Sequence, residues 1–466
     1  MEKEFFTLGI DIGSTFMKAA VFSSQREELL WTASLPAVER RPGTGRLHFE
    51  IDADKIFETI RSLISQALKH YPCNALLFST QMHGFVYHTD SRKDTYISWQ
   101  DARCLEQMPG KSYSYLEYLQ KLIPEETLRD CGVPLKPSLG LCNLFTLLAE
   151  DTSCPRSGEL FTLGSWLNHK LGGTNTCHIT NAAPLGLANV RTRNWNRELI
   201  GLLGFDDIRL PVIAASDFEI CGEGRLDGNS FLLYPDYGDQ QVSVLGAMPG
   251  RKNAIINIAT ASQISLISSS FVPGNYESRP YFENRYLNTI SNMPGGRNFA
   301  VLTNFLKECA LVLCGRKLST EDIWNALQDV YCPEGKGLEA DILFYPTEHK
   351  ADGGALKGIL PDNLSVNGLF TAAYKNTADI LEQALKKLAG QNALPDQITF
   401  LGGVSWKNPA LIKEIAVHLH MKYTKSVIPD EAFNGLYRLS LRVCGEISNL
   451  EDDRERHLHT EKGVNI

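Results

Sequence analysis

The chain has 466 residues, of which 43% are hydrophobic and 21% charged, and its formal net charge at pH 7 is −8. This composition is typical of a globular protein, and the length favours two domains. The negative charge argues against a nucleic-acid partner, which would need a local excess of cations. No apolar run is long enough to cross a bilayer, so no membrane partner is expected either.

The cysteines give no sign of a metal or disulfide framework. There are 11 of them, an odd number, and none forms a Cys-x-x-Cys pair with zinc-site spacing. The N-terminus runs into the first predicted strand without the pattern of a signal peptide. We therefore expect reduced thiols and a cytoplasmic location.

The first predicted elements are two strands, at residues 5–10 and 17–22, joined by a tight turn. A glycine in such a turn lets backbone N–H groups approach an anion, and hydroxyl and ammonium groups add donors. Asp11 would repel a phosphate unless a divalent cation lies between them. A hairpin that needs Gly13 only for its backbone geometry explains the pattern equally well. The candidate phosphate-binding residues are Asp11, Gly13, Ser14, Thr15 and Lys18.

A candidate polyol site follows. Apolar residues at helical spacing predict a helix at 54–71, and an apolar strand at 75–78 ends in polar residues, where α/β sheets usually bind ligands. Sugars need planar hydrogen-bonding groups and an aromatic face. The alternative is a capped strand end and a surface Asp–Arg ion pair. The candidate sugar-binding residues are Gln81, Met82, His83, Trp99, Asp101 and Arg103.

Residues 131–181 look less regular, with scattered Gly, Pro and Cys, and the next clear signal is at 234–241. Here Asp239 precedes a predicted helix at 242–247. A carboxylate at a helix N-terminus is kept ionised by the helix dipole, and one that faces a ligand could accept the proton of an attacking hydroxyl. N-capping alone is the commoner reason for Asp at this position.

A composition break at 248–253 is the candidate domain boundary, and the strand predicted at 254–258 ends in a small-residue turn around Thr260. That turn repeats the pattern of the first one. A helix at 369–389 and a strand at 397–401 lead to Gly402 and Gly403, which could hold a flat ring or ribose, and Asn408 with Pro409 opens another helix. A tight strand-to-helix connection without a ligand is an equal alternative.

Taken in this order, the segments resemble the FGGY carbohydrate kinases of the actin-like ATPase superfamily. The resemblance rests on four motifs, at 11–18, 238–241, 259–261 and 402–409. It implies an α/β fold of two actin-like, ribonuclease H-like ATPase domains, with mixed sheets flanked by helices and an active-site cleft between them. The implied divisions are 1–248, 249–446 and a charged C-terminal tail at 447–466.

The resemblance also implies an ATP-dependent sugar kinase. ATP and Mg²⁺ would be bound by the residues named above, with Asp11 and Asp239 near the metal, and Asp239 would be the catalytic base, with Gln240 beside it at the sugar. The segments at 81–84 and 99–104 are most similar to those of sedoheptulokinases. We therefore expect a ketose acceptor, sedoheptulose first and D-xylulose or another polyol next. A homodimer is left open.

The chain departs from the family pattern at several positions. The family usually has Gly before the Thr of the second phosphate turn, whereas this chain has Ala259, and the later small residue of the turn is Ala261. A methyl group in this turn would narrow backbone access to the γ-phosphate. His178 replaces a frequent Asp, and Thr146 a frequent Trp. A catalytically weak sugar or nucleotide sensor on the same fold is therefore the alternative from another functional class.

Overall fold

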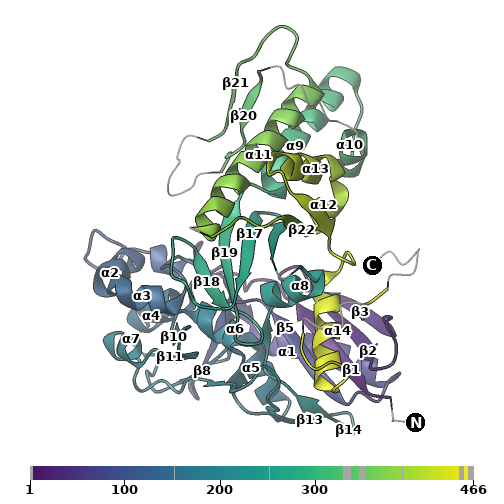
Figure 1. The fold of residues 1–466 in the computed structure, drawn as a ribbon. Helices are drawn as coiled ribbons and strands as arrows, with labels where there is room; N and C mark the ends of the chain where they lie inside the picture. Colours follow the sequence, from purple (N-terminus) through teal and green to yellow (C-terminus); the bar gives the residue numbers. More distant parts are fainter. Residues whose placement is uncertain are drawn as a thin grey trace. The chain divides into compact units, whose positions relative to one another are not determined.

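The computed structural model describes residues 4–151, 153–250, 252–328, 337–345, 353–390, 392–450 and 456–459 (Figure 1). The chain divides into two compact units. The first unit comprises Met1–Gly246, Ser268–Leu287 and Asp430–Ile466, and the second comprises Ala247–Ile267 and Asn288–Pro429. Two segments that lie beyond the sequence-based boundary at residue 248 therefore cluster with the first unit.

The first unit is built on a seven-stranded mixed sheet in the order β13–β14–β5–β1–β2–β3, with β15 also paired to β5. A second sheet has the order β4–β7–β6–β8. The strands that lie in this unit are β1 (Phe6–Ile12), β2 (Phe16–Ser23), β3 (Trp31–Pro36), β4 (Glu50–Asp52), β5 (Ala75–Thr80), β6 (Phe85–His88), β7 (Thr95–Ile97), β8 (Glu159–Phe161), β9 (Thr176–Cys177), β10 (Ala188–Asn189), β11 (Asn194–Trp195), β12 (Val212–Ile213), β13 (Gly222–Leu226), β14 (Asn229–Leu233), β15 (Tyr237–Gly238) and β18 (Glu277–Pro280).

Helices cover this framework. They are α1 (Ala53–Leu68), α2 (Tyr115–Leu122), α3 (Glu125–Cys131), α4 (Gly140–Glu150), α5 (Leu163–Lys170), α6 (Ile179–Ala182), α7 (Arg197–Leu202), α8 (Asp239–Ala247, whose last residue belongs to the second unit), α14 (Glu431–Val443) and the 3₁₀ turns η1 (Arg103–Leu105) and η2 (Ala183–Leu185).

The two faces of β1 pack against different helices, because successive strand residues point to opposite sides. Leu8, Ile10 and Ile12 share a buried cluster with the apolar side of α1. Gly9 faces α14, where a β-carbon would lie 3.2 Å from Cβ of Leu436. The predicted strands at 5–10 and 17–22 and the helix at 54–71 are confirmed, with β1 extended to include Asp11.

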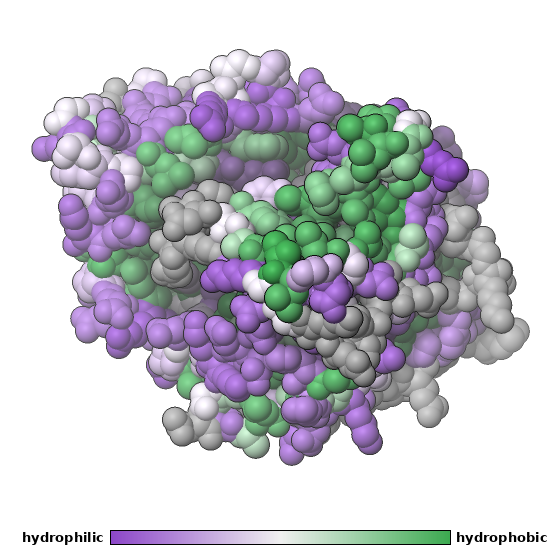
Figure 2. Space-filling view, turned by 90° about the horizontal axis from the view of Figure 1, so that it is seen from above, coloured by the Kyte–Doolittle hydropathy of each residue, from purple (hydrophilic) through white to green (hydrophobic). Residues whose placement is uncertain are grey.

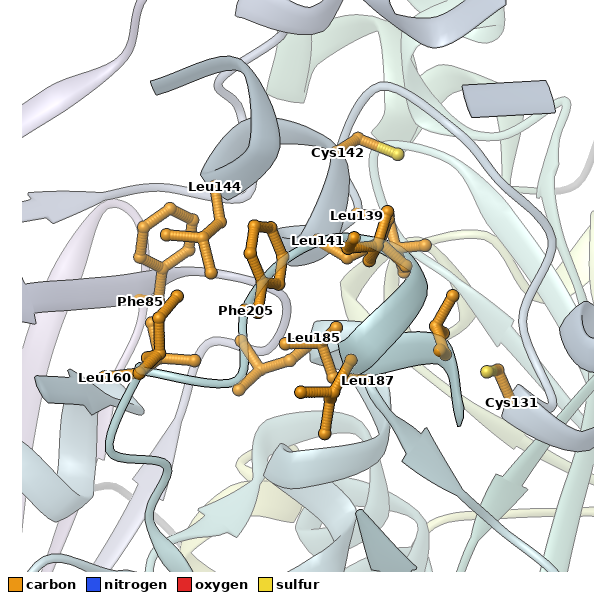
Figure 3. Close-up of a cluster of buried hydrophobic side chains, with 14 of the residues drawn as sticks. Phe85, Cys131, Leu139, Leu141, Cys142, Leu144, Leu160, Leu185, Leu187 and Phe205 are labelled. Atoms are coloured by element: carbon orange, nitrogen blue, oxygen red, sulfur yellow. The ribbon is translucent and has the colours of Figure 1, made fainter. Parts of the chain in front are cut away.

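The segment 131–181 is more regular than the sequence suggested. It contains α4, β8, α5 and α6, and α4 is buried along most of its length. Its side chains enter a second core cluster, which includes Leu139, Leu144 and Leu185 together with Phe85 (Figure 3). The sequence did not predict α4 because a helix that is buried on most sides shows little alternation between polar and apolar residues.

The second unit contains a sheet in which β17, β16, β22 and β23 are neighbours in that order. The predicted helix at 369–389 and the strands at 254–258 and 397–401 are confirmed. Its elements are β16 (Asn253–Ile258), β17 (Ser262–Ser268), β19 (Tyr286–Met293), β20 (Glu339–Asp341), β21 (Ala355–Lys357), β22 (Gln397–Leu401), β23 (Lys422–Lys425), α9 (Gly296–Cys314), α10 (Thr320–Leu327), α11 (Val366–Ala389), α12 (Gly403–Lys407) and α13 (Pro409–His418), with the outer residues of β17 and β19 in the first unit.

Helix α9 exposes large apolar side chains, among them Phe305, Leu311, Val312 and Leu313. Apolar side chains also gather on the face of the molecule shown in Figure 2. Among the described residues, none shows what would cover these side chains of α9, and the homodimer stays a prediction.

The described part of the C-terminal tail packs against the first unit. Leu458 is buried, and its N–H donates to Asn434 Oδ1 over 3.0 Å. The rest of the segment 451–466 lies outside the described residues. The ten cysteines among the described residues are free thiols, and Cys332 lies outside them. No helix in the described part of the chain has the length and apolar character needed to span a membrane.

Candidate active site

Three parallel strand ends bring the two predicted acids to one edge of the first sheet. Asp11 on β1 is the register partner of Ser79 on β5, and Ser79 is also the partner of Tyr237 on β15. Asp239 begins α8 directly after β15. The carboxyl end of a parallel strand is the usual ligand-binding edge of an α/β sheet. Asp11 and Asp239 are therefore close enough for the charge of Asp239 to raise the pKa of Asp11.

The first turn is open to solvent. The Gly13 N–H donates to the Phe16 carbonyl over 3.0 Å, and this bond closes the hairpin while Ser14 and Thr15 remain exposed. Lys18 forms an ion pair with Asp430 at the start of α14, with Nζ 2.8 Å from Oδ2. The turn therefore offers hydroxyl donors to a ligand, while its cation is held by an acid that the sequence analysis did not identify.

Burial makes the Asp11 carboxylate unusually easy to protonate. Desolvation raises its pKa to about 7, and the charges of Asp430 and Asp239 act in the same direction. A hydrogen bond of 2.7 Å from Ser79 Oγ and the charge of Lys18 oppose this rise. Several acids crowded into a poorly hydrated space are a setting in which a divalent cation binds well.

Asp239 has the features needed of a base. Its Oδ1 accepts the backbone N–H of Gln240 over 2.8 Å, while Oδ2 has no hydrogen-bond partner among the described residues. Burial raises the pKa of Asp239 to about 6, against the opposing effects of the Gln240 N–H and the charge of Arg279. The carboxylate is therefore mostly ionised near neutral pH and retains a free oxygen.

The neighbouring Asp236 has a different role. It is fully buried, and its carboxylate accepts hydrogen bonds from Thr80, Thr162, Gly164 and Asn181 at 2.8–3.3 Å. One of these donors binds Oδ1 and three bind Oδ2, and together they tie β5, α5 and α6 to β15. Because Asp236 has no exposed surface, a substrate does not reach this carboxylate. Only Asp239 of this pair is available for chemistry.

The predicted sugar motif at 81–83 lies against the Asp239 turn. A β-carbon on Gly238 would come within 2.8 Å of Met82 Sδ. His83 has a positive φ of 70° and its Nδ1 lies 3.0 Å from the Pro184 carbonyl. Burial, Lys136 and Arg279 lower the pKa of His83 well below its ordinary value. Since a carbonyl can only accept, Nδ1 carries the hydrogen of the neutral ring and Nε2 is left as an acceptor.

Asp101 and Arg103 form a buried ion pair. Arg103 donates from Nε and Nη2 to Asp101 and from Nη2 to Glu50, at 2.8–2.9 Å. The second Asp101 oxygen also accepts the Phe49 N–H. This occupancy favours a positioning role for the pair over direct contact with a sugar. Trp99, by contrast, is 40% exposed.

Four charged or polar residues beside the site were missed by sequence reasoning. Lys136 and Arg279 both pair with Glu277, and Arg279 also donates to Gln240 Oε1. Lys136 precedes α4, and Glu277 and Arg279 lie on β18. No local pattern links these segments to Asp239. The same holds for Asp430, although the pair Asp430–Glu431 is a recognisable helix start.

The departure at His178 is explained by a local network in the first unit. His178 caps α6, with Nδ1 2.8 Å from Thr180 Oγ1 and Nε2 3.0 Å from Asp217 Oδ1. Thr180 Oγ1 in turn accepts the Gly238 N–H over 2.9 Å. Thus His178 supports the turn that carries Asp239.

The Thr260 turn in the second unit packs on the start of α9. The Gly296 N–H donates to the Ala259 carbonyl, and the Arg297 N–H donates to the Thr260 carbonyl. A β-carbon on Gly295 would lie only 2.6 Å from the Ala261 carbonyl carbon. The exposed Thr260 therefore lies beside the consecutive glycines Gly295 and Gly296. The sequence analysis did not consider this glycine pair as part of a ligand site.

Gly402, Gly403 and Asn408 have distinct environments. Gly402 has φ of +89°, and a β-carbon there would lie 2.3 Å from Asn257 Oδ1. The backbone conformation and this close contact therefore require glycine at position 402, with or without a ligand. Gly403 is exposed and a β-carbon there would meet nothing within 4 Å, so this position is open to a ligand. Asn408 Oδ1 caps α13 through Leu411, and its Nδ2 donates to the Tyr374 hydroxyl.

Known proteins resemble this chain in sequence and in fold. Residues 6–227 match the N-terminal domain of the FGGY family of carbohydrate kinases. This likeness covers residues 6–227 of the 466-residue chain. It confirms the FGGY resemblance of the sequence in that part of the chain.

Relatives and solved structures extend the likeness. A glycerol kinase of Citrifermentans bemidjiense is 27% identical over an alignment that covers 62% of this chain and 59% of the glycerol kinase. Human sedoheptulokinase is 24% identical over an alignment that covers 64% of this chain and 69% of the sedoheptulokinase. The chain thus aligns with under two thirds of the glycerol kinase. The crystal structure of gluconate kinase from Lactobacillus acidophilus has a TM-score of 0.83 at 16% identity, covering 98% of this chain and 92% of that one. The predicted fold class, two actin-like domains with mixed sheets, is confirmed.

Proposed function

We propose that this protein is an ATP-dependent kinase that transfers the γ-phosphoryl group to a primary hydroxyl of a ketose. Sedoheptulose is the first candidate, because the segments at 81–84 and 99–104 resemble those of sedoheptulokinases, and D-xylulose or another polyol is the second. The observation that carries the proposal is the Asp239 carboxylate. It lies at the ligand-binding edge of the first sheet with one oxygen free and a pKa of about 6.

In the proposed reaction, Asp239 accepts a hydrogen bond from the acceptor hydroxyl and takes its proton as the acceptor oxygen bonds to the γ-phosphorus. The bond between that phosphorus and the β–γ bridging oxygen breaks, and ADP leaves. A pKa near the working pH keeps the base ionised while still allowing proton transfer. Positioning of the two reactants provides most of the acceleration in phosphoryl transfer. The neutral ring of His83 and the exposed Trp99 are proposed to orient the sugar.

The crowded acids Asp11, Asp239 and Asp430 support the proposal that Mg²⁺ accompanies the nucleotide, with Asp11 and Asp239 as the residues that would hold it. The ion would neutralise phosphate charge. For the nucleotide itself we propose Gly13, Ser14, Thr15 and Lys18 in the first unit. In the second unit we propose Thr260, Gly402, Gly403 and Asn408, the last acting through the helix it caps.

The test is ADP release with MgATP against a panel of ketoses and polyols. The parent protein is expected to turn over at least one ketose, and Asp239→Asn to lose nearly all turnover while a ketose still raises its melting temperature. Glu223→Gln, which changes an exposed acid on β13, is the matched control and should behave as the parent. Turnover by Asp239→Asn near the parent rate would refute the base assignment. Ligand-induced stabilisation without any turnover by the parent would favour a sensor.

A further inference from the structure

A buried charge cluster lies beside the proposed acceptor site, and no step of the proposed reaction uses it. Lys136 Nζ lies 2.8 Å from Glu277 Oε1, and Arg279 Nε lies 2.8 Å from Glu277 Oε2. The three residues form what we call the Lys136 cluster. Glu277 and Arg279 are buried, and the Lys136 side chain retains 18% of its exposure. Burying three charged groups costs desolvation free energy, and replacing such a cluster with apolar side chains is often neutral or stabilising. A role in stability alone therefore does not account for the Lys136 cluster.

The cluster is joined to the acceptor residues on two sides. Arg279 donates to Gln240, the neighbour of Asp239, and its charge lowers the pKa of Asp239 against the effect of burial. On the other side, both cations of the cluster act on the ring of His83. The chain that follows Lys136 also packs on His83, since a β-carbon on Gly140 would lie 2.9 Å from the His83 carbonyl oxygen.

Lys136 has donors to spare. Its ammonium group has three N–H donors, and Glu277 is its one hydrogen-bond partner within the described part of the chain. Burial lowers the pKa of Lys136, while Glu277 raises it, so the group is poorly hydrated but paired. A poorly hydrated cation with free donors at a site gains from hydrogen bonds to ligand hydroxyls.

The cations around the site are already matched by acids. Lys136 and Arg279 are offset by Glu277 and Asp239, Lys18 is paired with Asp430, His83 is neutral, and Asp11 adds a further acid. An acceptor with a carboxylate or phosphate would add an uncompensated charge to this buried setting, at a considerable free-energy cost.

We infer that Lys136, held by Glu277 and Arg279, is a specificity-determining residue that donates hydrogen bonds to acceptor hydroxyls, and that the matched charges select an uncharged polyhydroxyl acceptor over an acidic sugar. This inference rests on the proposed function. It adds Lys136 to the acceptor site and adds a preference for uncharged over acidic acceptors. Neither follows from the sequence motifs.

The first test is the variant Lys136→Met, which removes the ammonium group and keeps the length of the side chain. The Arg279–Glu277 pair remains to hold β18. Loss of a charged donor is expected to raise the KM for the best ketose by about tenfold or more, since such bonds contribute a factor of this order. The kcat and the KM for MgATP should stay near those of the parent, and Lys136→Arg should restore part of the loss. An unchanged ketose KM would overturn the assignment of Lys136.

The second test uses D-glucitol and D-gluconate. These two compounds differ only at one end of the carbon chain, where D-glucitol has a hydroxymethyl group and D-gluconate has a carboxylate. In the parent, we expect glucitol to compete with the ketose at least about tenfold better than gluconate, because the carboxylate is unpaired. Glu277→Gln removes one negative charge beside Lys136 and Arg279 and should reverse or abolish this gap. Equal competition by both compounds in the parent would overturn the discrimination rule.

Failure of the inference can be told apart from failure of the proposed function. If the parent phosphorylates a ketose but the variants leave its acceptor constants unchanged, only the inference is wrong. If the parent phosphorylates nothing on the panel, the proposed function is wrong, and calorimetric binding of glucitol and gluconate to the parent and to Lys136→Met then decides the inference. Should Glu277→Gln fail to fold, the parent's glucitol-to-gluconate ratio and Lys136→Met remain decisive.

Discussion

Ser79 on β5 donates its hydroxyl hydrogen to Asp11 Oδ1 on β1 over 2.7 Å, and the two residues are also register partners in the parallel pair of strands. The same residue, Ser79, is the register partner of Tyr237 on β15. One position in the central strand thus fixes both the orientation of Asp11 and the point at which the chain turns toward Asp239.

Asp11→Asn should stabilise the protein at alkaline pH in the absence of Mg²⁺. The pKa of Asp11 is raised from 3.8 to about 7, chiefly by burial. A raised carboxyl pKa contributes stability that is fully present below the unfolded pKa and is lost as the pH rises through the folded pKa. The melting temperature of the variant should therefore exceed that of the parent by a margin that grows between about pH 4 and pH 7 and then levels off. A margin that is independent of pH would contradict this.

Asp236→Ala and Asp239→Ala should separate structure from chemistry. The first removes the acceptor for four buried donors and should destabilise the first unit by about 3 kcal/mol or more. The second removes one local hydrogen bond and should leave the melting temperature near that of the parent while abolishing turnover. Thermal melts and ADP release on the same two preparations provide the check. Loss of turnover in both with equal stability would show that the distinction is wrong.

Much of the fold could be predicted because its signals are local. The turn between β1 and β2, the apolar periodicity of α1 and α11, and the strand before Gly402 each depend on residues close together in the chain. The acids Asp11 and Asp239 could be proposed for the same reason, since each follows a strand or begins a helix. The paired strands then place them at one edge of the sheet.

The rest of the site depends on contacts between distant segments, which a single sequence does not show. Lys136 and Glu277 are 141 positions apart, and Lys18 and Asp430 are 412 apart. The surroundings of a side chain are equally invisible in a sequence. Asp236 and Asp239 look alike there, but the structure shows four donors to Asp236 and one to the side chain of Asp239. Likewise, the sequence gives no reason to treat Gly402 and Gly403 differently, but of the two only Gly402 has a positive φ.

Gly402→Ala and Gly403→Ala are matched variants that test this difference. The first places a methyl group 2.3 Å from Asn257 Oδ1 at a φ of +89°, and should destabilise the second unit by about 1–3 kcal/mol from backbone strain alone. The second places a methyl group in open space and should melt close to the parent. If a nucleotide lies against this turn, Gly403→Ala should raise the KM for ATP severalfold with the ketose KM unchanged. A parental KM for ATP in a folded Gly403→Ala would argue against nucleotide contact there.

Trp99→Ala and Arg103→Met should distinguish direct contact with the sugar from positioning of the site. Trp99 is 40% exposed, so its loss should cost little stability but should raise the ketose KM severalfold by removing an aromatic face. Arg103 is buried between Asp101 and Glu50, and its loss leaves those carboxylates unpaired, at a cost of about 3–5 kcal/mol. Adding Asp101→Asn to Arg103→Met should recover part of that stability, because one of the unpaired charges is removed. A double variant as unstable as Arg103→Met would indicate that Arg103 acts through packing and not through its charge.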